Sequence, residues 1–314
     1  MRSGAGWRAV LGMMVALGMA GCGGGGDDGD GIVTTTPTPT PSPVPTPTAT
    51  PSPVPTPTAT PSPVPSTTGS WWRPDAATTW QWQLSGTVDT RYAVTAYDID
   101  LFDTPVTTIA QLHAAKRRVI CYFSAGSSEN WRSDDGKFAA SDRGSALDGW
   151  VGERWLSVTS TTVRAVMQGR LDLARSKGCD GVEPDNVDGY ANRNGLGITA
   201  AQQLDYNRFL AREAHARGLA IGLKNDLDQI ADLEGVFDFA VNEQCHEFDE
   251  CGQLKPFTAA AKPVFVAEYK GDYRNNSGGA RDRLCSASRA AGLHTLVLAQ
   301  ALDNSFRFAC DVEG

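Results

Sequence analysis

The sequence predicts a (β/α)8 TIM barrel that follows a long segment with no fold of its own. Residues 71–314 have the length of one barrel domain. Within them, short apolar runs rich in β-formers alternate with amphipathic helical segments, which indicates parallel strands joined by helices. An open doubly wound sheet is the alternative, but no Gly-x-Gly-x-x-Gly turn follows the first run. We therefore expect a single α/β barrel domain.

The chain begins with a segment typical of a bacterial lipoprotein signal peptide, residues 1–21. Arg2 and Arg8 make its start positive, and the apolar stretch Ala9–Met19 is too short to span a bilayer as a stable helix. Met-Ala-Gly before Cys22 resembles a lipobox, which predicts cleavage there and lipidation of the Cys22 thiol. Ordinary secretion, with Cys22 incidental, is the alternative. Both interpretations export the protein, and a glycine after the modified cysteine favours anchoring to an outer membrane.

Residues 22–70 have a composition that does not support a packed domain. Four consecutive glycines and an acidic patch lead into a Thr-Pro tract, in which residues 41–50 recur unchanged at 51–60. Thirteen of the 18 prolines lie in this tract, so the segment has little apolar surface to offset ordering and favours extended polyproline II. We expect a disordered but semi-rigid stalk that holds the barrel away from a membrane.

The chain is acidic, with 36 Asp and Glu residues, 28 Lys and Arg residues and a formal net charge of −8. Removal of residues 1–21, which contain two arginines and no acid, brings this charge to −10. Such a charge disfavours nucleic-acid binding and suits a cationic substrate. The chain has no metal or nucleotide motif. We therefore expect no cofactor and no metal, a monomer, and contact with a membrane only through the lipid.

Six cysteines remain besides the one in the lipobox, an even number that favours disulfides in an exported protein. One predicted bridge joins neighbouring strands, one closes a five-residue loop, and one connects the last helix to the tail: Cys121–Cys179, Cys245–Cys251 and Cys285–Cys310. A zinc site is the alternative, but the spacings do not suit one and the nearby His246 stands alone.

Eight apolar runs have the length and composition of buried strands. They are Trp80–Leu84, Ala93–Ile99, Arg118–Ser124, Gly181–Asp185, Ala220–Lys224, Phe237–Glu243, Val264–Tyr269 and Thr295–Gln300. Helical segments such as Val163–Ser176 and Ala200–Arg217 lie between them. The second of these has Thr199 as its N-cap and Gly218 just after its end, both favoured at helix boundaries.

Polar and aromatic residues stand at the C-terminal end of every predicted strand, where barrel enzymes carry their active sites. The residues that we expect to bind substrate are Trp82, Asp98, Asp100, Tyr122, Glu183, Lys224, Asn225, Asp226, Glu268, Tyr269 and Gln300. Strands often end in polar turn residues, which is the alternative for any one of these positions. That alternative does not account for all eight strand ends together.

Asp185 and Glu243 are the residues that we expect to be catalytic. Cleavage of a glycosidic bond needs one carboxyl group to protonate the leaving oxygen and a second to attack or to activate water. These two acids end two strands on either side of one intervening strand, so they face a common cleft. Glu183 lies two residues before Asp185 on the same side of its strand, deeper in the barrel, where we expect it to contact Lys224. Asp188 follows in the loop, where turn stabilisation is its expected role.

Aromatic side chains offer flat faces to sugar rings. Those available here are Trp82, Tyr122, Trp150, Trp155, Tyr190 and Tyr269. A place in the core is an equally supported interpretation for Trp82 and Trp155. Residues 125–150 form a long stretch rich in Gly, Ser and Asp, and loops of this length are usually functional. We expect this loop to form one wall of an extended groove, as an endo-acting enzyme requires.

Six short motifs, which occur in the expected order over about residues 71–310, resemble glycoside hydrolase family 114. The motifs are WQWQLSG (Trp80–Gly86), CYFSAG (Cys121–Gly126), GERWL (Gly152–Leu156), GVEPDN (Gly181–Asn186), GLKND (Gly222–Asp226) and NEQC (Asn242–Cys245). Ser157 and Val158 depart from the Asp-Ile that the family pattern has after Leu156. The resemblance does not extend to the signal segment or the stalk.

The resemblance implies an endo-α-1,4-polygalactosaminidase of TIM-barrel fold, with Asp185 and Glu243 as its catalytic carboxylates. By analogy with α-galactosidase-like barrels, Asp185 would be the nucleophile and Glu243 the acid/base of a retaining mechanism. The substrate partner would be an α-1,4-linked amino-sugar polysaccharide, a cation that acidic residues at the barrel mouth would attract. Two alternatives remain: a surface lectin or adhesin on a stalk, and a glycosidase of another specificity.

Overall fold

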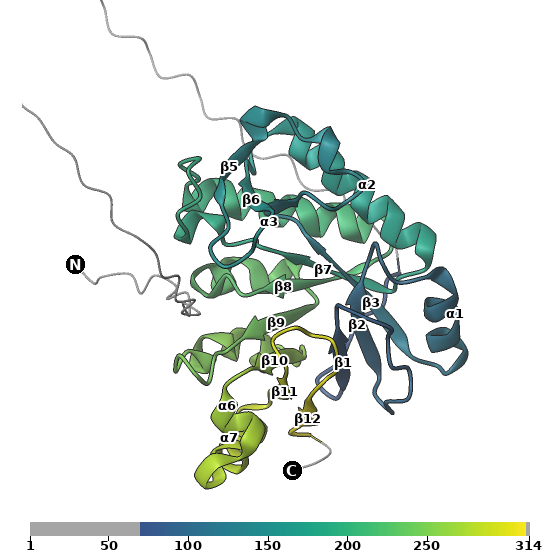
Figure 1. Cartoon of the computed structure of the whole chain (residues 1–314), viewed down its shortest axis with the longest axis vertical. Coiled ribbons are helices and arrows are strands. Elements are labelled where there is room, and N and C mark those ends of the chain that lie inside the picture. Colours follow the sequence, from purple (N-terminus) through teal and green to yellow (C-terminus); the bar gives the residue numbers. More distant parts are fainter. Residues whose placement is uncertain (1–69, 312–314) are drawn as a thin grey trace, which may run out of the picture. The chain divides into compact units, whose positions relative to one another are not determined.

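The computed structural model describes residues 70–311. The predicted signal segment, the lipidated Cys22 and the stalk up to residue 69 lie outside the described residues. Eight parallel strands form a curled sheet in chain order (Figure 1). Their bounds are β1 Trp80–Gln83, β2 Ala96–Asp100, β3 Arg118–Ser124, β7 Gly181–Asp185, β8 Ala220–Lys224, β9 Phe239–Glu243, β10 Val264–Glu268 and β11 His294–Leu298. These are the eight strands that the sequence predicts, with ends shifted by at most three residues.

The α-helices lie on the outer side of this sheet (Figure 1). Their bounds are α1 Val106–Ala114, α2 Thr161–Lys177, α3 Ala200–Ala216, α4 Ile230–Leu233, α5 Lys255–Ala259, α6 Gly271–Asn275 and α7 Ala280–Ala291. The expected boundary of α3 is confirmed, because Thr199 and Gln202 form a capping box and Gly218, in the left-handed region at φ +73°, follows its last turn. None of the helices within residues 70–311 has both the length and the apolar character needed to cross a membrane.

The connection from β1 to β2 and the segment after β11 contain no α-helix, so the expected alternation fails at the two ends of the domain. A short strand, β12 Arg307–Ala309, instead pairs antiparallel with β11. Within the described residues no backbone ladder joins β1 to β11. Individual hydrogen bonds hold this seam, including one of 2.9 Å from the Trp80 indole to the His294 carbonyl and one of 3.0 Å from the Leu84 amide to the Leu302 carbonyl. The strands therefore curl into a barrel of the TIM type.

Side chains alternate between the two sides of each strand, which divides the core into two parts. Outward positions pack under the helices in the larger cluster. Inward positions form an apolar floor in which the rings of Trp80 and Phe239 each lie against Phe265. Gly222 makes room for this floor, since a Cβ at that position would lie 2.3 Å from the Phe239 ring. Inward positions nearer the C-terminal strand ends are polar.

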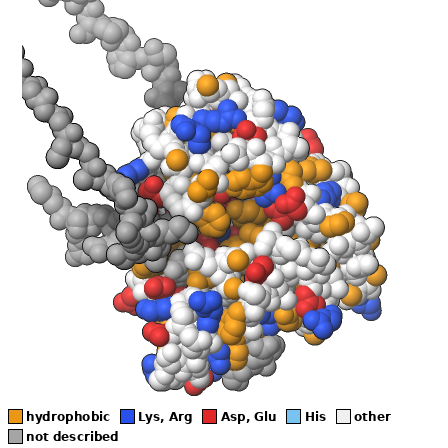
Figure 2. Space-filling view, in the orientation of Figure 1, with side chains coloured by type: hydrophobic (Ala, Val, Ile, Leu, Met, Phe, Trp, Pro, Cys, Tyr) orange, Lys and Arg blue, Asp and Glu red, His pale blue; other side chains and the backbone are white. Residues whose placement is uncertain are grey.

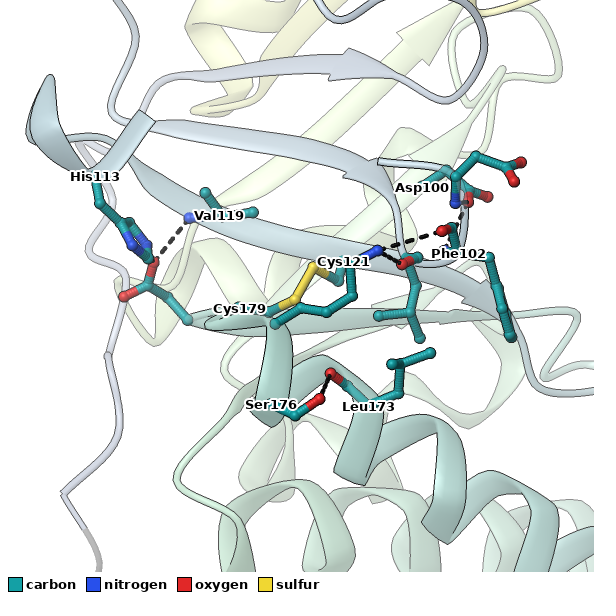
Figure 3. The surroundings of a disulfide bond; sticks show 12 residues. Asp100, Phe102, His113, Val119, Cys121, Leu173, Ser176 and Cys179 are labelled. Carbon is teal, nitrogen blue, oxygen red and sulfur yellow. Dashed lines mark hydrogen bonds and ion pairs between the residues drawn. A yellow bond between two sulfur atoms is a disulfide. The ribbon is translucent and has the colours of Figure 1, made fainter. Parts of the chain in front are cut away.

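The three predicted disulfides are confirmed: Cys121–Cys179, Cys245–Cys251 and Cys285–Cys310. The first joins β3 to the turn just before β7, on the helix side of the sheet near α2 (Figure 3). It thereby links two strands that are also paired through backbone hydrogen bonds, although 58 residues separate the cysteines. The second closes the loop directly after β9, two residues beyond Glu243.

The long connection after β3 is not an irregular loop. It contains a three-stranded antiparallel sheet with the order β4-β6-β5, made by Ser127–Glu129, Arg143–Ala146 (β5) and Glu153–Leu156 (β6). Polar runs such as Ser-Ser-Glu lack the apolar alternation that marks a strand, so the sequence gives no signal for this sheet. Buried ion pairs attach it to the barrel: Arg132 contacts Asp100 at 2.6 Å.

Candidate active site

The polar inward positions of β3, β7, β8, β9 and the residue after β10 meet at the C-terminal end of the barrel. They are Tyr122, Glu183, Asp185, Lys224, Glu243 and Tyr269. Tyr122, Lys224, Glu243 and Tyr269 each lie an even number of residues after an inward residue of the apolar floor on their strand, so they face the interior. On β7, Val182 packs in the outer cluster, so Glu183 and Asp185, one and three residues later, face the interior as well. Figure 2 shows a hollow over the strands of the sheet, with hydrophobic and acidic side chains gathered in and around it.

Lys224 lies at the centre of this group. Its Nζ is 3.1 Å from Asp185 Oδ1 and 3.0 Å from Glu243 Oε2. A third carboxylate oxygen, Glu183 Oε1, lies 3.3 Å away, which confirms the expected contact. The side chain is 2% exposed, and burial alone would favour the neutral amine. The surrounding carboxylates outweigh burial and raise the pKa of Lys224 well above its ordinary value.

This ammonium group brings the two predicted catalytic acids together. Both contacted oxygens lie near 3 Å from one nitrogen, so they are no more than about 6 Å apart. Asp185 and Glu243 remain partly accessible, with side-chain exposures of 17% and 21%. Two adjacent, accessible carboxylates at the mouth of a barrel have the arrangement that glycosidic cleavage needs.

Two tyrosines each donate a hydrogen bond to one of these acids. The Tyr122 hydroxyl donates to Asp185 Oδ2 at 2.8 Å, and the Tyr269 hydroxyl donates to Glu243 Oε1 at 2.5 Å. Burial, together with the neighbouring carboxylates, raises the pKa of both phenols well above the ordinary value. Both hydroxyls are therefore protonated and act as donors at neutral pH.

The two acids differ in the number of donors that reach them. Asp185 accepts a third hydrogen bond, of 2.7 Å, from the backbone amide of Asn186. Donors aimed at a carboxylate stabilise its charge, which suits Asp185 to the role of an ionised nucleophile. Glu243 is oriented through its backbone, whose amide donates to Asn225 Oδ1 at 3.0 Å. Asn186 and Asn225 both have positive φ, a conformation that asparagine tolerates better than most residues.

Several predicted substrate-binding residues do not reach the mouth. Asp98 is fully buried below Lys224, and Trp82, 1% exposed, has its ring 4.9 Å from the Lys224 ammonium. Asp100 is 4% exposed and paired with Arg132. Asp98 and Trp82 face the interior as expected but lie below the opening, whereas Asp100 stands at the strand end and is covered by Arg132.

Three other residues that we expected to bind substrate lie away from the mouth of the barrel. Glu268 follows the outward residues of β10, so it faces the helix side, where its Oε1 accepts a hydrogen bond of 2.8 Å from the His246 amide. Asp226, 3% exposed, accepts a hydrogen bond of 2.8 Å from Asn207. Gln300 is exposed beyond the end of β11. The ring of negative charge expected at the mouth from Asp98, Asp100, Asp226 and Glu268 is therefore not formed, because all four side chains are buried.

Some residues near the site gave no separate signal in the sequence. The Ser127 hydroxyl donates to Glu153 Oε2 at 2.5 Å within the inserted sheet. The Asn186 side chain, just after the strand that carries Asp185, donates to Ser124 Oγ at 3.0 Å and to Ser127 Oγ at 3.3 Å, so it joins that strand to the inserted sheet. Burial raises the pKa of Glu153 to about 7. Serine and asparagine are common turn residues, and the motifs that contain Ser124, Glu153 and Asn186 marked this region without giving these residues a role.

The zinc site that was the alternative to a disulfide near His246 is not supported. The sulfur atoms of Cys245 and Cys251 and a ring nitrogen of His246 lie within 4.8 Å of one another. Both sulfurs are used in a disulfide, and His246 Nε2 is 2.8 Å from the Ser288 hydroxyl. A cysteine binds zinc as a thiolate, and both cysteines here are joined in a disulfide. The three residues therefore form a bridge with a histidine beside it.

The comparisons with known proteins agree with this geometry. The model of glycoside-hydrolase family GH114 matches residues 61–313. The chain belongs to glycoside hydrolase family GH114. The resemblance seen in the six sequence motifs is thereby confirmed, and the protein is a glycoside hydrolase with a TIM-barrel fold. None of the curated proteins compared with the chain matches it.

Solved structures give the same fold. The crystal structure of Ega3 from Aspergillus fumigatus, in complex with galactosamine, is 46% identical in sequence, with a TM-score of 0.72, and the match covers 77% of this chain and 98% of that one. The glycoside hydrolase domain of PelA from Pseudomonas aeruginosa matches with a TM-score of 0.56 over 72% of this chain and 95% of that one. Its identity is 14%, so it shows the shared fold alone.

The buried acid Glu268 predicts a pH dependence of stability. Burial raises the pKa of Glu268 from 4.5 to about 8, although the His246 amide hydrogen bond opposes this. The folded protein therefore holds a proton that the unfolded chain loses between these values, and stability falls as pH rises through that window. Glu268→Gln keeps the acceptor and mimics the protonated acid, so the variant should match the wild type near pH 5 and exceed it by on the order of 1 kcal/mol or more near pH 9.

Urea denaturation of both proteins across this range measures the difference. Asp148→Asn, at an exposed position between β5 and β6, serves as the control and should leave the pH dependence between pH 5 and 9 unchanged. A Glu268→Gln protein that is less stable than the wild type at every pH would contradict the prediction.

Proposed function

We propose that this GH114 enzyme hydrolyses an α-1,4-linked, galactosamine-containing polysaccharide, cutting within the chain and retaining the anomeric configuration. The observation that carries the proposal is the pair Asp185 and Glu243, held by Lys224 at the barrel mouth. The specificity is supported by the 46% identity to Ega3, whose structure contains galactosamine. The formal net charge of the chain, −8, suits a polymer of deacetylated amino sugars, which is a cation.

The geometry supports a two-step displacement. In the first step Glu243 gives its proton to the leaving glycosidic oxygen while Asp185 attacks the anomeric carbon, which forms a covalent glycosyl ester and breaks the linkage. In the second step Glu243, now a carboxylate, takes a proton from water, and the resulting attack on the anomeric carbon releases Asp185. Retaining enzymes have carboxyl groups about 5–5.5 Å apart and inverting enzymes about 6.5–9.5 Å. The limit of about 6 Å between the contacted oxygens supports retention.

An extended groove is supported by the inserted sheet. Trp131, between β4 and β5, and Trp150, between β5 and β6, are 52% and 54% exposed. Such aromatic faces suit sugar rings on either side of the bond that is cleaved. Cutting within the chain then gives a ladder of oligosaccharides at early times, whereas an enzyme that acts on chain ends gives one short product.

Loss of either catalytic acid should abolish hydrolysis. We expect Asp185→Asn and Glu243→Gln each to lower kcat by about 1000-fold or more, because a missing nucleophile or proton donor removes a step of the reaction. The measurement is mass spectrometry of the products from a deacetylated α-1,4-galactosamine polymer. Melting temperatures within a few degrees of the wild type show that the variants fold.

The same digestion separates the enzyme from the lectin alternative. A wild-type protein that binds the polymer without shortening it would favour a binding protein, and a panel of other α-linked amino-sugar polymers would reveal a different specificity. A double variant of Asp185 and Glu243 that still cleaves would contradict the assignment of both residues.

Retention has a direct spectroscopic test. The first reducing ends released from an α-linked polymer should be α-anomers, which proton NMR distinguishes from β-anomers before mutarotation equilibrates them. An initial β-anomer would show inversion, and the site would then have to hold a water molecule between Asp185 and the anomeric carbon.

We propose, in addition, that the protein is exported and held by a lipid on Cys22 to the bacterial cell envelope, with its outer membrane as the site. The proposal is supported by the apolar segment and the lipobox-like residues before Cys22. Cells that express the full chain and are fed an alkyne-tagged fatty acid should label the wild type and not Cys22→Ser. Unlabelled wild-type protein in the culture medium would indicate ordinary secretion instead.

A further inference from the structure

We propose that Asp98 and Glu183 act as one positioning unit, in which two buried carboxyl groups share a single proton and hold the Lys224 ammonium between the catalytic acids. This inference rests on the proposed function, because Asp185 and Glu243 are the acids that are positioned. Neither Asp98 nor Glu183 is accessible to a substrate, since both side chains have no exposed surface.

The first argument concerns unmatched acceptors. All four carboxyl oxygens of Asp98 and Glu183 are buried, and no N–H or O–H group of the described residues donates a hydrogen bond to them apart from the Lys224 ammonium, 3.3 Å from Glu183 Oε1. Two ionised carboxylates in such a place would repel each other and would lack donors. A proton placed between them creates the missing donor, on Asp98, and leaves one negative charge on the pair. Solvent supplies this proton when the chain folds.

The charges around the pair point the same way. Burial, followed by the charge of Glu183 and a hydrogen bond to it, raises the pKa of Asp98 well above its ordinary value, and the only opposing charge is Lys224. Burial raises the pKa of Glu183 to about 7, while Lys224 and the hydrogen bond from Asp98 lower it. Asp185 and Glu243 face the pair as well and add negative charge. Because the Lys224 ammonium lies 3.3 Å from Glu183 Oε1, the negative charge of the pair is placed on Glu183 and the proton on Asp98.

The second argument concerns Lys224. An ammonium group has three N–H donors, and three carboxylate oxygens lie 3.0–3.3 Å from its nitrogen, one each from Glu183, Asp185 and Glu243. Two of these acids take part in the reaction and change their charge during it. Glu183 does not, so it is the constant partner that keeps the ammonium in place while Asp185 becomes an ester.

The test compares two isosteric changes, Glu183→Gln and Asp98→Asn, with one truncation, Asp98→Ala. Glu183→Gln removes the constant charge beside Lys224 and should lower kcat about 10–100-fold with a smaller effect on KM, because displacement of reacting groups acts mainly on the transition state. Asp98→Ala removes the proton that the pair needs and should lower kcat about tenfold or more. Asp98→Asn keeps a donor toward Glu183 and should restore most of that loss.

An infrared measurement tests the shared proton without any substrate. The difference spectrum between wild type and Asp98→Asn at pH 7 should contain the C=O stretch of a protonated carboxylic acid, lost in the variant. An absent band, or an Asp98→Asn enzyme as impaired as Asp98→Ala, would overturn the proposal. So would an Asp98→Asn protein that fails to fold, because the variant is isosteric with a protonated acid. If the proposed function fails, the wild type leaves the polymer intact while the band remains.

Discussion

One buried ammonium group connects the stability of this barrel to its chemistry. Lys224 is 2% exposed, and a cation at such a place is costly unless carboxylates surround it. Three carboxylates do so at 3.0–3.3 Å. Two of them, Asp185 and Glu243, are the acids that a glycoside hydrolase needs, and their shared contact keeps them close in spite of their mutual repulsion. The interaction that makes the buried lysine tolerable is therefore the one that sets the catalytic geometry.

The remaining structure keeps this cluster in place from below and from the side. Below it, the packed rings of Trp80, Phe239 and Phe265 fill the barrel interior and support the polar residues. Disulfides connect β3 to the turn before β7 and close the loop after β9. Both lie beside strands that carry catalytic acids. The inserted sheet adds hydrogen bonds through Ser127 and Asn186, which join it to the strand end of Asp185.

The strands and the catalytic pair could be predicted because both depend on local pattern. Apolar runs of five to seven residues recur, and each of them ends in polar groups. The inserted sheet could not be predicted, since β4 and β5 are polar and are held by partners distant in the chain, such as the Arg132–Asp100 pair. We expected both Glu268 and Tyr269 to bind substrate, because both stand at a strand end. Neighbouring residues of a strand face opposite sides, and Glu268 lies on the side of the helices.

The sequence by itself predicted the barrel class, the three disulfide pairs and the two acids that we propose as catalytic, because apolar runs, cysteine positions and strand-end motifs can be read along the chain. Only the tertiary structure decided which polar residues touch. It shows that Lys224 contacts both acids, that Tyr122 and Tyr269 each donate to one of them, and that Asp98 and Glu268 are buried. These facts depend on how far the strands are staggered and curled, which is a property of the whole sheet and not of any one segment.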